Sequence, residues 1–489
     1  MIATIIPIRT NTTIAICIQI QVGDISLEAY FATGRPPPRA TASRDYRGGM
    51  ERLHASTAAA AAALACALLW LAVVGPARAA SSAHRTGAPP LGGINIGGLE
   101  SSSSPAEADR SIARAKQLHA RIVRVAFPWS VLEPASQAFD PHALDFTDRL
   151  VSDAAAAHLR VSVTVGSTPC WASSAPAALL GKCRPGQNSK ASAWPPRNAG
   201  DYGAVVGALA QRYGSRLAAL EVWNEPDQAN EAYFAGPNKP AAYATVLRAA
   251  YPAVKQADPS LPVLGGSLVG SNGRFLRALY KAGVRGFYDG LSVHFYNLTL
   301  ASLRAIHEVQ LANGDATPLW LDEFGWTSCW PHLRSEQEQS CVTPQAQAEN
   351  LRNTFRALSR SSYVDAAVVY KLQDSPREDF GVLSSAGARK RSFAALAGVL
   401  AAPFGSAGSV SLSLRRQGAG VLASGSAPVG DYMQLEAFHG ATLRYRALFT
   451  LDRFNRFSIK LPAVLGTKGL RVKVFQYWAG SARGAQKSI

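Results

Sequence analysis

Residues 220–226 read Leu-Glu-Val-Trp-Asn-Glu-Pro, an apolar run that ends in an amide, a carboxyl group and a proline. The apolar residues are typical of a buried strand, and Pro226 ends it because proline cannot donate a hydrogen bond to a neighbouring strand. A second run, residues 318–326, reads Pro-Leu-Trp-Leu-Asp-Glu-Phe-Gly-Trp and repeats the design. Each run places one glutamate, Glu225 or Glu323, at the carboxyl end of a predicted strand.

The two glutamates lie 98 positions apart. That separation matches three strand-plus-helix units of roughly 30 to 35 residues, the repeat expected of a barrel of parallel strands. One acid at a strand end commonly caps a helix or pairs with an arginine. Two acids at equivalent strand ends favour paired acid chemistry.

Eight apolar runs alternate with helix-like segments in this part of the chain. The predicted strands are 91–98, 122–127, 160–166, 220–223, 261–266, 290–296, 318–324 and 366–371. An open doubly wound sheet more often has roughly five to seven strands, and no glycine-rich nucleotide loop follows the first run. We therefore predict an α/β fold, a (β/α)8 TIM barrel, over residues 91–402.

After residue 403 the helical spacing is replaced by short alternating runs. The predicted strands are 410–414, 432–438, 442–451, 457–461 and 470–478. Five or more strands joined by Gly, Ser and Asp predict a small C-terminal β-sandwich over residues 403–489. Such a domain could bind carbohydrate, or it could pack on the barrel and stiffen it.

The first 90 residues show the features of a leader. Residues 1–49 have no sustained period, and we interpret them as a disordered extension or the result of a start codon placed too early. Residues 50–79 are typical of a secretory signal with an apolar segment at 58–74, and residues 80–90 form a linker. We expect a secreted or cell-envelope protein with no stable membrane insertion after cleavage. An uncleaved anchor is the alternative.

Four cysteines remain once the leader is excluded, and export permits disulfides. Three pairings are possible. Pairing within each local loop is favoured, and the spacings are longer than those of zinc sites. The favoured disulfides are Cys170 with Cys183 and Cys329 with Cys341.

The formal net charge is +17. Such a charge attracts anionic polymers, although a generally basic surface is the alternative interpretation. No nucleic-acid-binding motif accompanies the charge, so we expect no nucleic-acid partner. Lys182, Arg184 and Lys190 lie in a long loop that could line a groove for an extended, anionic polysaccharide. We expect a monomer.

Active sites of such barrels gather at the carboxyl ends of the strands. The side chains predicted there are Arg124, Trp129, Trp171, Asn224, Glu225, His294, Tyr296, Glu323 and Trp326. Cutting a glycosidic bond requires one protonated and one ionised carboxyl group. Arg124 and Tyr296 could keep Glu323 ionised, and Asn224 could hold the 2-hydroxyl of the sugar. The three tryptophans could stack on pyranose rings, or they could belong to the core.

Several motifs carry a family resemblance over residues 91–400. They are Val123-Arg124 with Trp129 and Glu133-Pro134, Thr168-Pro169-Cys170-Trp171, Val222-Trp223-Asn224-Glu225-Pro226, His294-Phe295-Tyr296, Asp322-Glu323-Phe324-Gly325-Trp326 and Phe380-Gly381-Val382-Leu383. Together they resemble the glycoside hydrolases of clan A, closest to family 39 and the cellulase-type enzymes of family 5. The resemblance implies a retaining enzyme without metal or organic cofactor.

By the same resemblance, Glu225 is the acid/base and Glu323 the nucleophile. Asn224, Arg124, His294 and Tyr296 are the supporting residues. Clan members often end the eighth strand with a tryptophan beneath the reactive sugar, whereas this chain has Tyr370-Lys371, which puts the floor of that subsite in doubt. Lys371 could meet an acidic sugar or point outward.

The resulting hypothesis is a secreted glycosidase that acts on a polysaccharide or oligosaccharide by double displacement. It predicts carboxyl groups about 5 to 5.5 Å apart, against roughly 6.5 to 9.5 Å for an inverting pair. Three alternatives remain open: a transglycosylase, a non-catalytic glycan-binding protein on the same barrel, and an envelope scaffold held by an uncleaved leader.

Overall fold

The chain forms two compact units, residues 1–77 and 78–489. This computed structural model describes residues 2–10, 13–22, 25–32, 90–98, 104–296, 299–332, 341–359, 361–401, 408–429, 432–477 and 484–489. The predicted secretory signal and nearly all of the linker lie outside the described residues. The prediction of export through that signal therefore stays a prediction.

The first unit contains a three-stranded antiparallel sheet in the order β1-β2-β3. Its strands are β1 (Ile2–Thr10), β2 (Thr13–Val22) and β3 (Ile25–Ala32). We expected no regular structure here and overlooked the alternation of isoleucines at 14, 16, 18 and 20, which is the period of a strand. The interpretation of residues 1–49 as an extension outside the folded domains stays a prediction.

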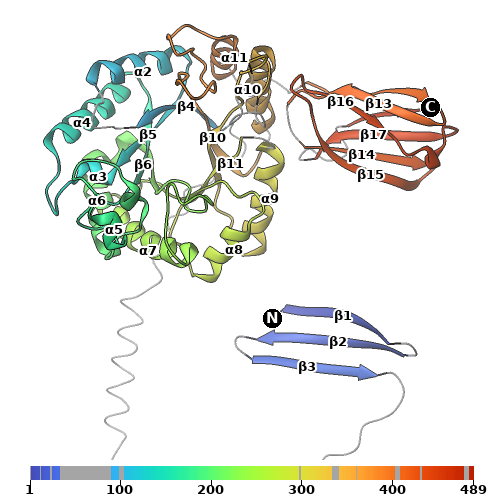
Figure 1. Cartoon of the computed structure of the whole chain (residues 1–489), viewed down its shortest axis with the longest axis horizontal. Helices are drawn as coiled ribbons and strands as arrows, with labels where there is room; N and C mark the ends of the chain where they lie inside the picture. Colours follow the sequence, from blue (N-terminus) through green and yellow to red (C-terminus); the bar gives the residue numbers. More distant parts are fainter. Residues whose placement is uncertain are drawn as a thin grey trace, which may run out of the picture. The chain divides into compact units, whose positions relative to one another are not determined.

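The second unit begins with a closed barrel of eight parallel strands, which confirms the predicted fold (Figure 1). The strands are β4 (Leu91–Gly98), β5 (Ile122–Pro128), β6 (Arg160–Gly166), β7 (Leu217–Val222), β8 (Val263–Leu268), β9 (Gly290–His294), β10 (Leu319–Phe324) and β11 (Val364–Val369). Strand β11 pairs with β4 and closes the ring. All eight carboxyl ends therefore meet at one rim.

Helices surround this barrel (Figure 1). They are α2 (Pro105–Gln117), α3 (Trp129–Leu132), α4 (Pro141–Ala156), α5 (Ala177–Leu180), α6 (Ala199–Tyr213), α7 (Lys239–Ala257), α8 (Arg274–Lys281), α9 (Thr299–Ala312), α10 (Pro344–Leu358) and α11 (Arg391–Leu400). Local sequence defines several starts: the side chains of Ser104, Asp140 and Thr343 each accept a hydrogen bond from the first helical turn. A proline at the first helical position assists all three helices.

Two apolar clusters hold the barrel together. The larger one lies between strands and helices, and it includes Val123, Val263 and Leu321. A smaller one contains Ile122, Ala218, Ala219, Leu264, Trp320 and Ala366, near the amino ends of their strands. Because side chains alternate across a strand, neighbours such as Ile122 and Val123 point to opposite faces, and the smaller cluster fills the barrel interior.

The C-terminal region is a β-sandwich of two antiparallel sheets, as predicted. One sheet contains β12 (Ser413–Gln417), β13 (Gly420–Ser426) and β16 (Arg456–Lys460). The other contains β15 (Thr442–Thr450), β14 (Tyr432–His439), β17 (Leu470–Gln476) and β18 (Ala485–Ser488). Sequence patterns missed β13 and β18. A separate apolar core that includes Val421, Met433, Leu435 and Val472 joins the sheets.

Contacts tie the sandwich to α10 of the barrel. The Nδ2 of Asn353 donates to the carbonyl of Pro428 at 2.7 Å, and the Nδ2 of Asn455 donates to the Oδ1 of Asn350 at 2.7 Å. These bonds support the interpretation that the domain packs on the barrel and stiffens it.

Both predicted disulfides are present, Cys170–Cys183 and Cys329–Cys341. The local pairing favoured from sequence is therefore confirmed. Among the described residues, no helix combines the length and apolar content that crossing a bilayer requires.

Candidate active site

Glu225 reaches the mouth of the barrel through an unusual turn after β7. Trp223 and Glu225 have φ angles of 70° and 45°, in the left-handed region that residues with side chains rarely adopt. Such a conformation costs on the order of 1 to 3 kcal/mol per residue and persists where surrounding contacts impose it. Here the amide of Trp223 continues the ladder to Val165 at 2.8 Å, and its indole donates to the carbonyl of Tyr233 at 2.7 Å. The turn thereby holds Glu225 in place.

Glu225 has few polar partners. Its Oε1 lies 2.8 Å from the Nδ1 of His294, and its Oε2 accepts a hydrogen bond from the Nε2 of Gln228 at 2.9 Å. The residue is only 7% exposed. A buried carboxyl group with two partners, one of them able to exchange a proton, suits a group that must be protonated in part of a reaction cycle.

Glu323, on β10, is surrounded by three hydrogen-bond donors. Arg124 donates from Nη1 at 2.5 Å and Asn95 from Nδ2 at 3.1 Å, both to Oε1. The hydroxyl of Tyr296 donates to Oε2 at 2.5 Å. Three donors stabilise the ionised form of a carboxyl group. Sequence reasoning missed Asn95, although a polar residue between Ile94 and Ile96 on the first strand was a usable signal.

The two glutamates meet at His294. Its Nδ1 is 2.8 Å from Glu225 and 3.4 Å from Glu323. One side-chain atom from each of these three residues lies within 4.8 Å of the other two. Burial lowers the pKa of His294, but the charge of Glu323 and the hydrogen bond to Glu225 outweigh burial and raise its pKa above the ordinary value. The fold therefore brings together carboxyl groups almost a hundred positions apart.

Arg124, on β5, donates hydrogen bonds to several side chains of the candidate site. Besides Glu323, it donates from Nε to Glu221 at 2.9 Å and from Nη2 to the Oδ1 of Asn224 at 3.0 Å. Burial lowers its pKa, but the carboxylates of Glu221, Asp322 and Glu323 outweigh burial and raise its pKa further. Arg124 is therefore a fixed cation that orients both Asn224 and Glu323.

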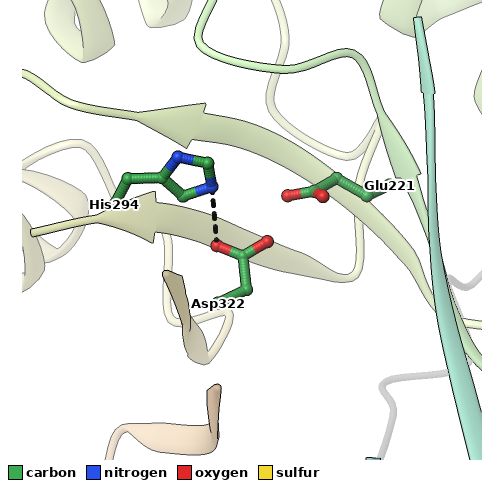
Figure 2. Close-up of side chains that lie close together, drawn as sticks. All are labelled: Glu221, His294 and Asp322. Atoms are coloured by element: carbon green, nitrogen blue, oxygen red, sulfur yellow. Dashed lines mark ion pairs between the residues drawn. The ribbon is translucent and has the colours of Figure 1, made fainter. Parts of the chain in front are cut away.

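A second layer of polar groups lies beneath this rim, inside the barrel (Figure 2). Glu221 on β7 is fully buried and accepts hydrogen bonds from the hydroxyls of Thr164, Ser267 and Ser292. Burial raises its pKa, but the charge of Arg124, a hydrogen bond with Asp322, the charge of His294 and the hydroxyl of Ser267 outweigh burial and lower its pKa well below the usual range. Sequence reasoning quoted Glu221 and Asp322 within their strands but assigned neither to the site; an acid inside an apolar strand was the available signal.

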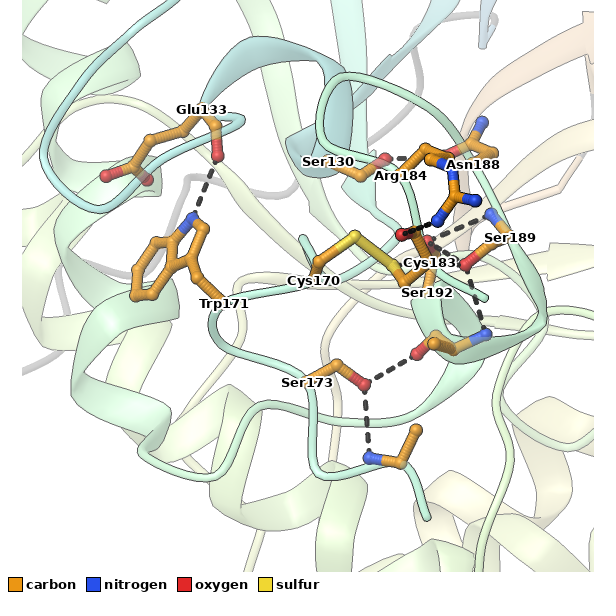
Figure 3. Close-up of a disulfide and its surroundings, with 12 residues drawn as sticks. Ser130, Glu133, Cys170, Trp171, Ser173, Cys183, Arg184, Asn188, Ser189 and Ser192 are labelled. Carbon is orange, nitrogen blue, oxygen red and sulfur yellow. Dashed lines mark hydrogen bonds between the residues drawn. A yellow bond between two sulfur atoms is a disulfide. The ribbon is translucent and has the colours of Figure 1, made fainter. Parts of the chain in front are cut away.

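The structure corrects the expected role of two tryptophans. Trp129 is 0% exposed, and its indole donates to the Oε2 of Glu133 at 2.6 Å. Trp326 is 3% exposed, so neither ring presents a face to a sugar. Trp171 is partly exposed, and its indole donates to the carbonyl of Glu133 at 3.0 Å (Figure 3). Trp171 therefore remains a candidate for stacking.

One exposed aromatic residue was missed by sequence reasoning. Tyr233, in the loop after Glu225, is 47% exposed. Partial burial and the charges of Glu225 and Glu323 raise its pKa. It is a further candidate for contact with a ligand.

The loop after β6 is held by the Cys170–Cys183 disulfide and by serine hydrogen bonds (Figure 3). Ser173 donates from Oγ to the carbonyl of Ala191 at 2.7 Å. The three basic residues predicted to line a groove are exposed; they are Lys182, Arg184 and Lys190. Their interaction with a polysaccharide stays a prediction.

Tyr370 occupies the end of β11, where a tryptophan was expected from the resemblance. Its ring packs edge to face against Tyr296, with 5.7 Å between centroids. Lys371 donates to the Oε2 of Glu378 at 2.6 Å, which offsets its charge and weakens the case that it meets an acidic sugar. Gly325 lets the backbone of Tyr370 lie close to β10, because a Cβ at position 325 would collide with the carbonyl oxygen of Tyr370. A cavity of about 600 Å³ adjoins Asn95 and Lys371.

Two groups of side chains have the composition of a metal site. They are Glu221, His294 and Asp322, and Glu225, His294 and Glu323. The guanidinium of Arg124 contacts Glu221, Asp322 and Glu323, so a divalent cation would experience direct repulsion. We assign these side chains to proton and hydrogen-bond chemistry.

The chain was compared with known families and structures. No family model matches it, and no curated protein matches it. A family 39 glycoside hydrolase from the gut symbiont Bacteroides cellulosilyticus WH2 is similar in structure, with 18% identity, a TM-score of 0.49, and coverage of 77% of this chain and 80% of that one. A family 39 enzyme from Xanthomonas axonopodis pv. citri has 15% identity, a TM-score of 0.47, and coverage of 77% and 93%.

A family 30 endoxylanase from Clostridium papyrosolvens C71 is also similar, with 12% identity and a TM-score of 0.47. The likeness covers 80% of this chain and 97% of that one. At these identities and scores the likenesses assign no chemistry to the site.

Proposed function

We propose that this protein is a secreted retaining glycoside hydrolase that cleaves O-glycosidic bonds of a polysaccharide or oligosaccharide. One observation carries the proposal: two buried carboxyl groups with different surroundings, Glu225 and Glu323, lie within 4.8 Å of the same imidazole at the carboxyl rim of the barrel. Glycosidic bond cleavage requires two carboxyl groups, one to protonate the leaving oxygen and one to attack the anomeric carbon.

The mechanism is double displacement. In the first step a carboxylate oxygen of Glu323 bonds to the anomeric carbon while protonated Glu225 transfers its proton to the departing oxygen. In the second step Glu225 removes a proton from water, and that water displaces Glu323 from the anomeric carbon. Two displacements at the same carbon retain its configuration.

The surrounding residues have separate tasks in this scheme. Arg124, Asn95 and Tyr296 hold Glu323 in a single orientation, which reduces the reorganisation needed for attack. Asn224, fixed by Arg124, is placed to bond the sugar 2-hydroxyl. The Nδ1 of His294 contacts both carboxyl groups, so its interaction with Glu225 changes when Glu225 loses and regains its proton.

The separation of the carboxyl groups supports retention over inversion. Retaining enzymes hold them about 5 to 5.5 Å apart, whereas inverting enzymes need roughly 6.5 to 9.5 Å to admit a water molecule. One carboxylate oxygen of Glu225 and one of Glu323 lie within 4.8 Å of each other, and this close approach of single atoms is in keeping with the shorter class.

Compartment and substrate class are less specific parts of the proposal. Two disulfides support an oxidising compartment outside the cell. The formal charge of +17 supports attraction to a polysaccharide that bears acidic groups. We propose a monomer without a nucleic-acid partner.

The test uses activated aryl glycosides of several sugars, followed by a panel of plant, bacterial exopolysaccharide and cell-wall glycans. We expect Glu323→Gln to lower kcat by roughly 10⁴-fold or more, because the attacking atom is lost. Glu308→Gln, an exposed acid on α9 paired with Arg304, is the matched control and should retain full activity.

The anomer released first, followed by proton NMR, reports the stereochemistry. Retained configuration is expected. Undiminished hydrolysis by Glu323→Gln would remove the nucleophile assignment, and release of the inverted anomer would remove double displacement. Products longer than the substrate would identify a transglycosylase, in which a sugar replaces water in the second step.

A further inference from the structure

Asp322 is a buried carboxyl group that the proposed reaction does not use. It directly precedes Glu323 on β10 and is 0% exposed. Within the part of the chain that the structure describes, no group donates a hydrogen bond to either of its oxygens. An ionised carboxylate in such a position would be strongly destabilising, because burial without donors leaves its charge unsolvated.

Its neighbour Glu221 has the opposite environment. Glu221 accepts hydrogen bonds from Thr164, Ser267, Ser292 and Arg124. Side-chain atoms of Glu221, His294 and Asp322 lie within 4.8 Å of one another (Figure 2). Two acids in one enclosed space cannot both remain ionised without cost, and the one with donors retains the charge.

Arg124 cannot neutralise every acid around it. Its guanidinium lies 2.8 Å from Glu221, 2.5 Å from Glu323 and 3.2 Å from Asp322. One permanent positive charge therefore faces three buried carboxyl groups. The contact of Arg124 to Asp322 is the longest of the three, and it does not meet the geometry of a hydrogen bond. The Nε2 of His294 lies 3.4 Å from the Oδ1 of Asp322 (Figure 2), but this contact does not meet the geometry of a hydrogen bond either.

We propose that Asp322 is uncharged in the native protein and donates its proton to Glu221, so that it acts as a positioning residue for Arg124 and Glu323. The pair Glu221 and Asp322 then carries a single negative charge. Arg124 remains available to hold Glu323 as the attacking carboxylate. The positioning role rests on the proposed function, whereas the location of the proton does not.

Electrostatics agree with the geometry. Burial and the negative charge of Glu221 raise the pKa of Asp322 well above the usual range, and Arg124 opposes the shift without cancelling it. Titratable and charged groups from every packed element enter this balance. They are Arg124 on β5, Glu221 on β7, Tyr243 on α7, His294 on β9 and Glu323 on β10.

Asp322→Asn is the decisive variant, because asparagine resembles a neutral aspartic acid and keeps a donor toward Glu221. We expect kcat and KM of Asp322→Asn to stay within about threefold of the native values. Glu221→Gln removes the charge that Arg124 requires, and it should lower kcat by about 100-fold through misplacement of Glu323. Comparable losses in the two variants would overturn the proposal, because both acids would then be needed in ionised form.

Thermal unfolding provides a reading that does not depend on hydrolysis. An acid whose pKa is raised on folding stabilises the native state below its unfolded pKa of about 3.9, and this contribution is lost as pH rises toward the folded value. The Tm of the native protein should therefore fall relative to that of Asp322→Asn as pH rises above 4. A Tm of Asp322→Asn that is lower than native by the same amount at every pH would contradict a neutral Asp322.

Infrared spectroscopy at pH 8 detects the proton directly, and it requires no variant at position 322. The Glu225→Gln protein is prepared with aspartate that carries ¹³C at the side-chain carboxyl carbon. If Asp322 is protonated, the carbonyl stretching band of the protonated acid should move to lower frequency on labelling. No shift would overturn the proposal. A band that appears only after dialysis against EDTA would show a metal ion in place of the proton, which would also overturn it.

These readings separate the two hypotheses. If no glycan is hydrolysed but the labelled band shifts, the proposed function fails and the shared proton stands. If glycans are hydrolysed but the band does not shift, only the proposal for Asp322 fails.

Discussion

Two layers of the same barrel interior differ in nearly every physical respect. The amino-end layer contains Ile122, Ala219 and Trp320. Two residues further along the same strands are Arg124, Glu221 and Asp322, which belong to the carboxyl-end layer. A step of two residues returns to the same face of a strand, so apolar and charged side chains are stacked along a single interior.

This difference shows that one layer of the barrel interior stabilises the fold and the other holds the side chains of the candidate active site. The apolar layer contributes favourable burial, roughly 25 cal/mol per Å² of apolar surface. The charged layer is costly to bury, and it is tolerated because nearly every charge has a partner of fixed geometry. Substitutions in the two layers should therefore differ in their effects on the free energy of unfolding and on kcat.

The largest effect is expected for Arg124→Met. Arg124 contacts Glu221, Asp322 and Glu323, so its removal leaves buried acids uncompensated, and the free energy of unfolding should fall by about 3 to 5 kcal/mol. Hydrolytic activity should be lost as well. Urea denaturation and aryl glycoside hydrolysis measure the two effects. Arg149→Met, which removes an exposed pair with Asp109, is the control and should change little.

A somewhat smaller effect on stability, with none on chemistry, is expected for Leu264→Ala. Leu264 is fully buried in the amino-end layer, so its truncation should lower the free energy of unfolding by about 2 to 5 kcal/mol. The kcat of the folded fraction should stay unchanged. Leu311→Ala, at a position 55% exposed, is the matched control. A large loss of kcat in Leu264→Ala would show that the two layers are coupled.

The smallest effect concerns the pH dependence of stability through His294. Its pKa is raised on folding, so protonation stabilises the native state fully below about pH 6.5. That contribution is lost as pH rises through the raised value. Between pH 6 and 9 the Tm of His294→Gln should therefore decline less steeply than that of the native protein. His142→Gln, exposed on α4, should keep the native slope.

Much of the site could be predicted because each functional side chain follows an apolar run. Glu225, Glu323, His294 and Tyr296 all end strands or lie near their ends, and a closed barrel brings such ends together, whereas Arg124 lies within β5 and points into the same interior. Trp129 and Trp326 were misjudged for the same reason. A position near a strand end does not reveal whether a ring turns toward the mouth or into the core.

Asn95 and Asp322 were overlooked because their roles depend on partners that are distant in the sequence. Nothing in Ile94-Asn95-Ile96 indicates that the amide meets Glu323, a residue 228 positions away. The alternating isoleucines near the amino terminus were overlooked for a simpler reason: no sustained period was recognised there.

The sequence by itself determined the order of strands and helices, the β-sandwich, the local disulfides and the two glutamates at strand ends. These follow from periodicity, turn residues and short spacing, which act between near neighbours along the chain. The tertiary structure alone decided which acid has donors and which has none, because charge and burial depend on atoms from many strands. The contrast between Glu221, with four donating neighbours, and Asp322, with none among the described residues, arises from closure of the barrel.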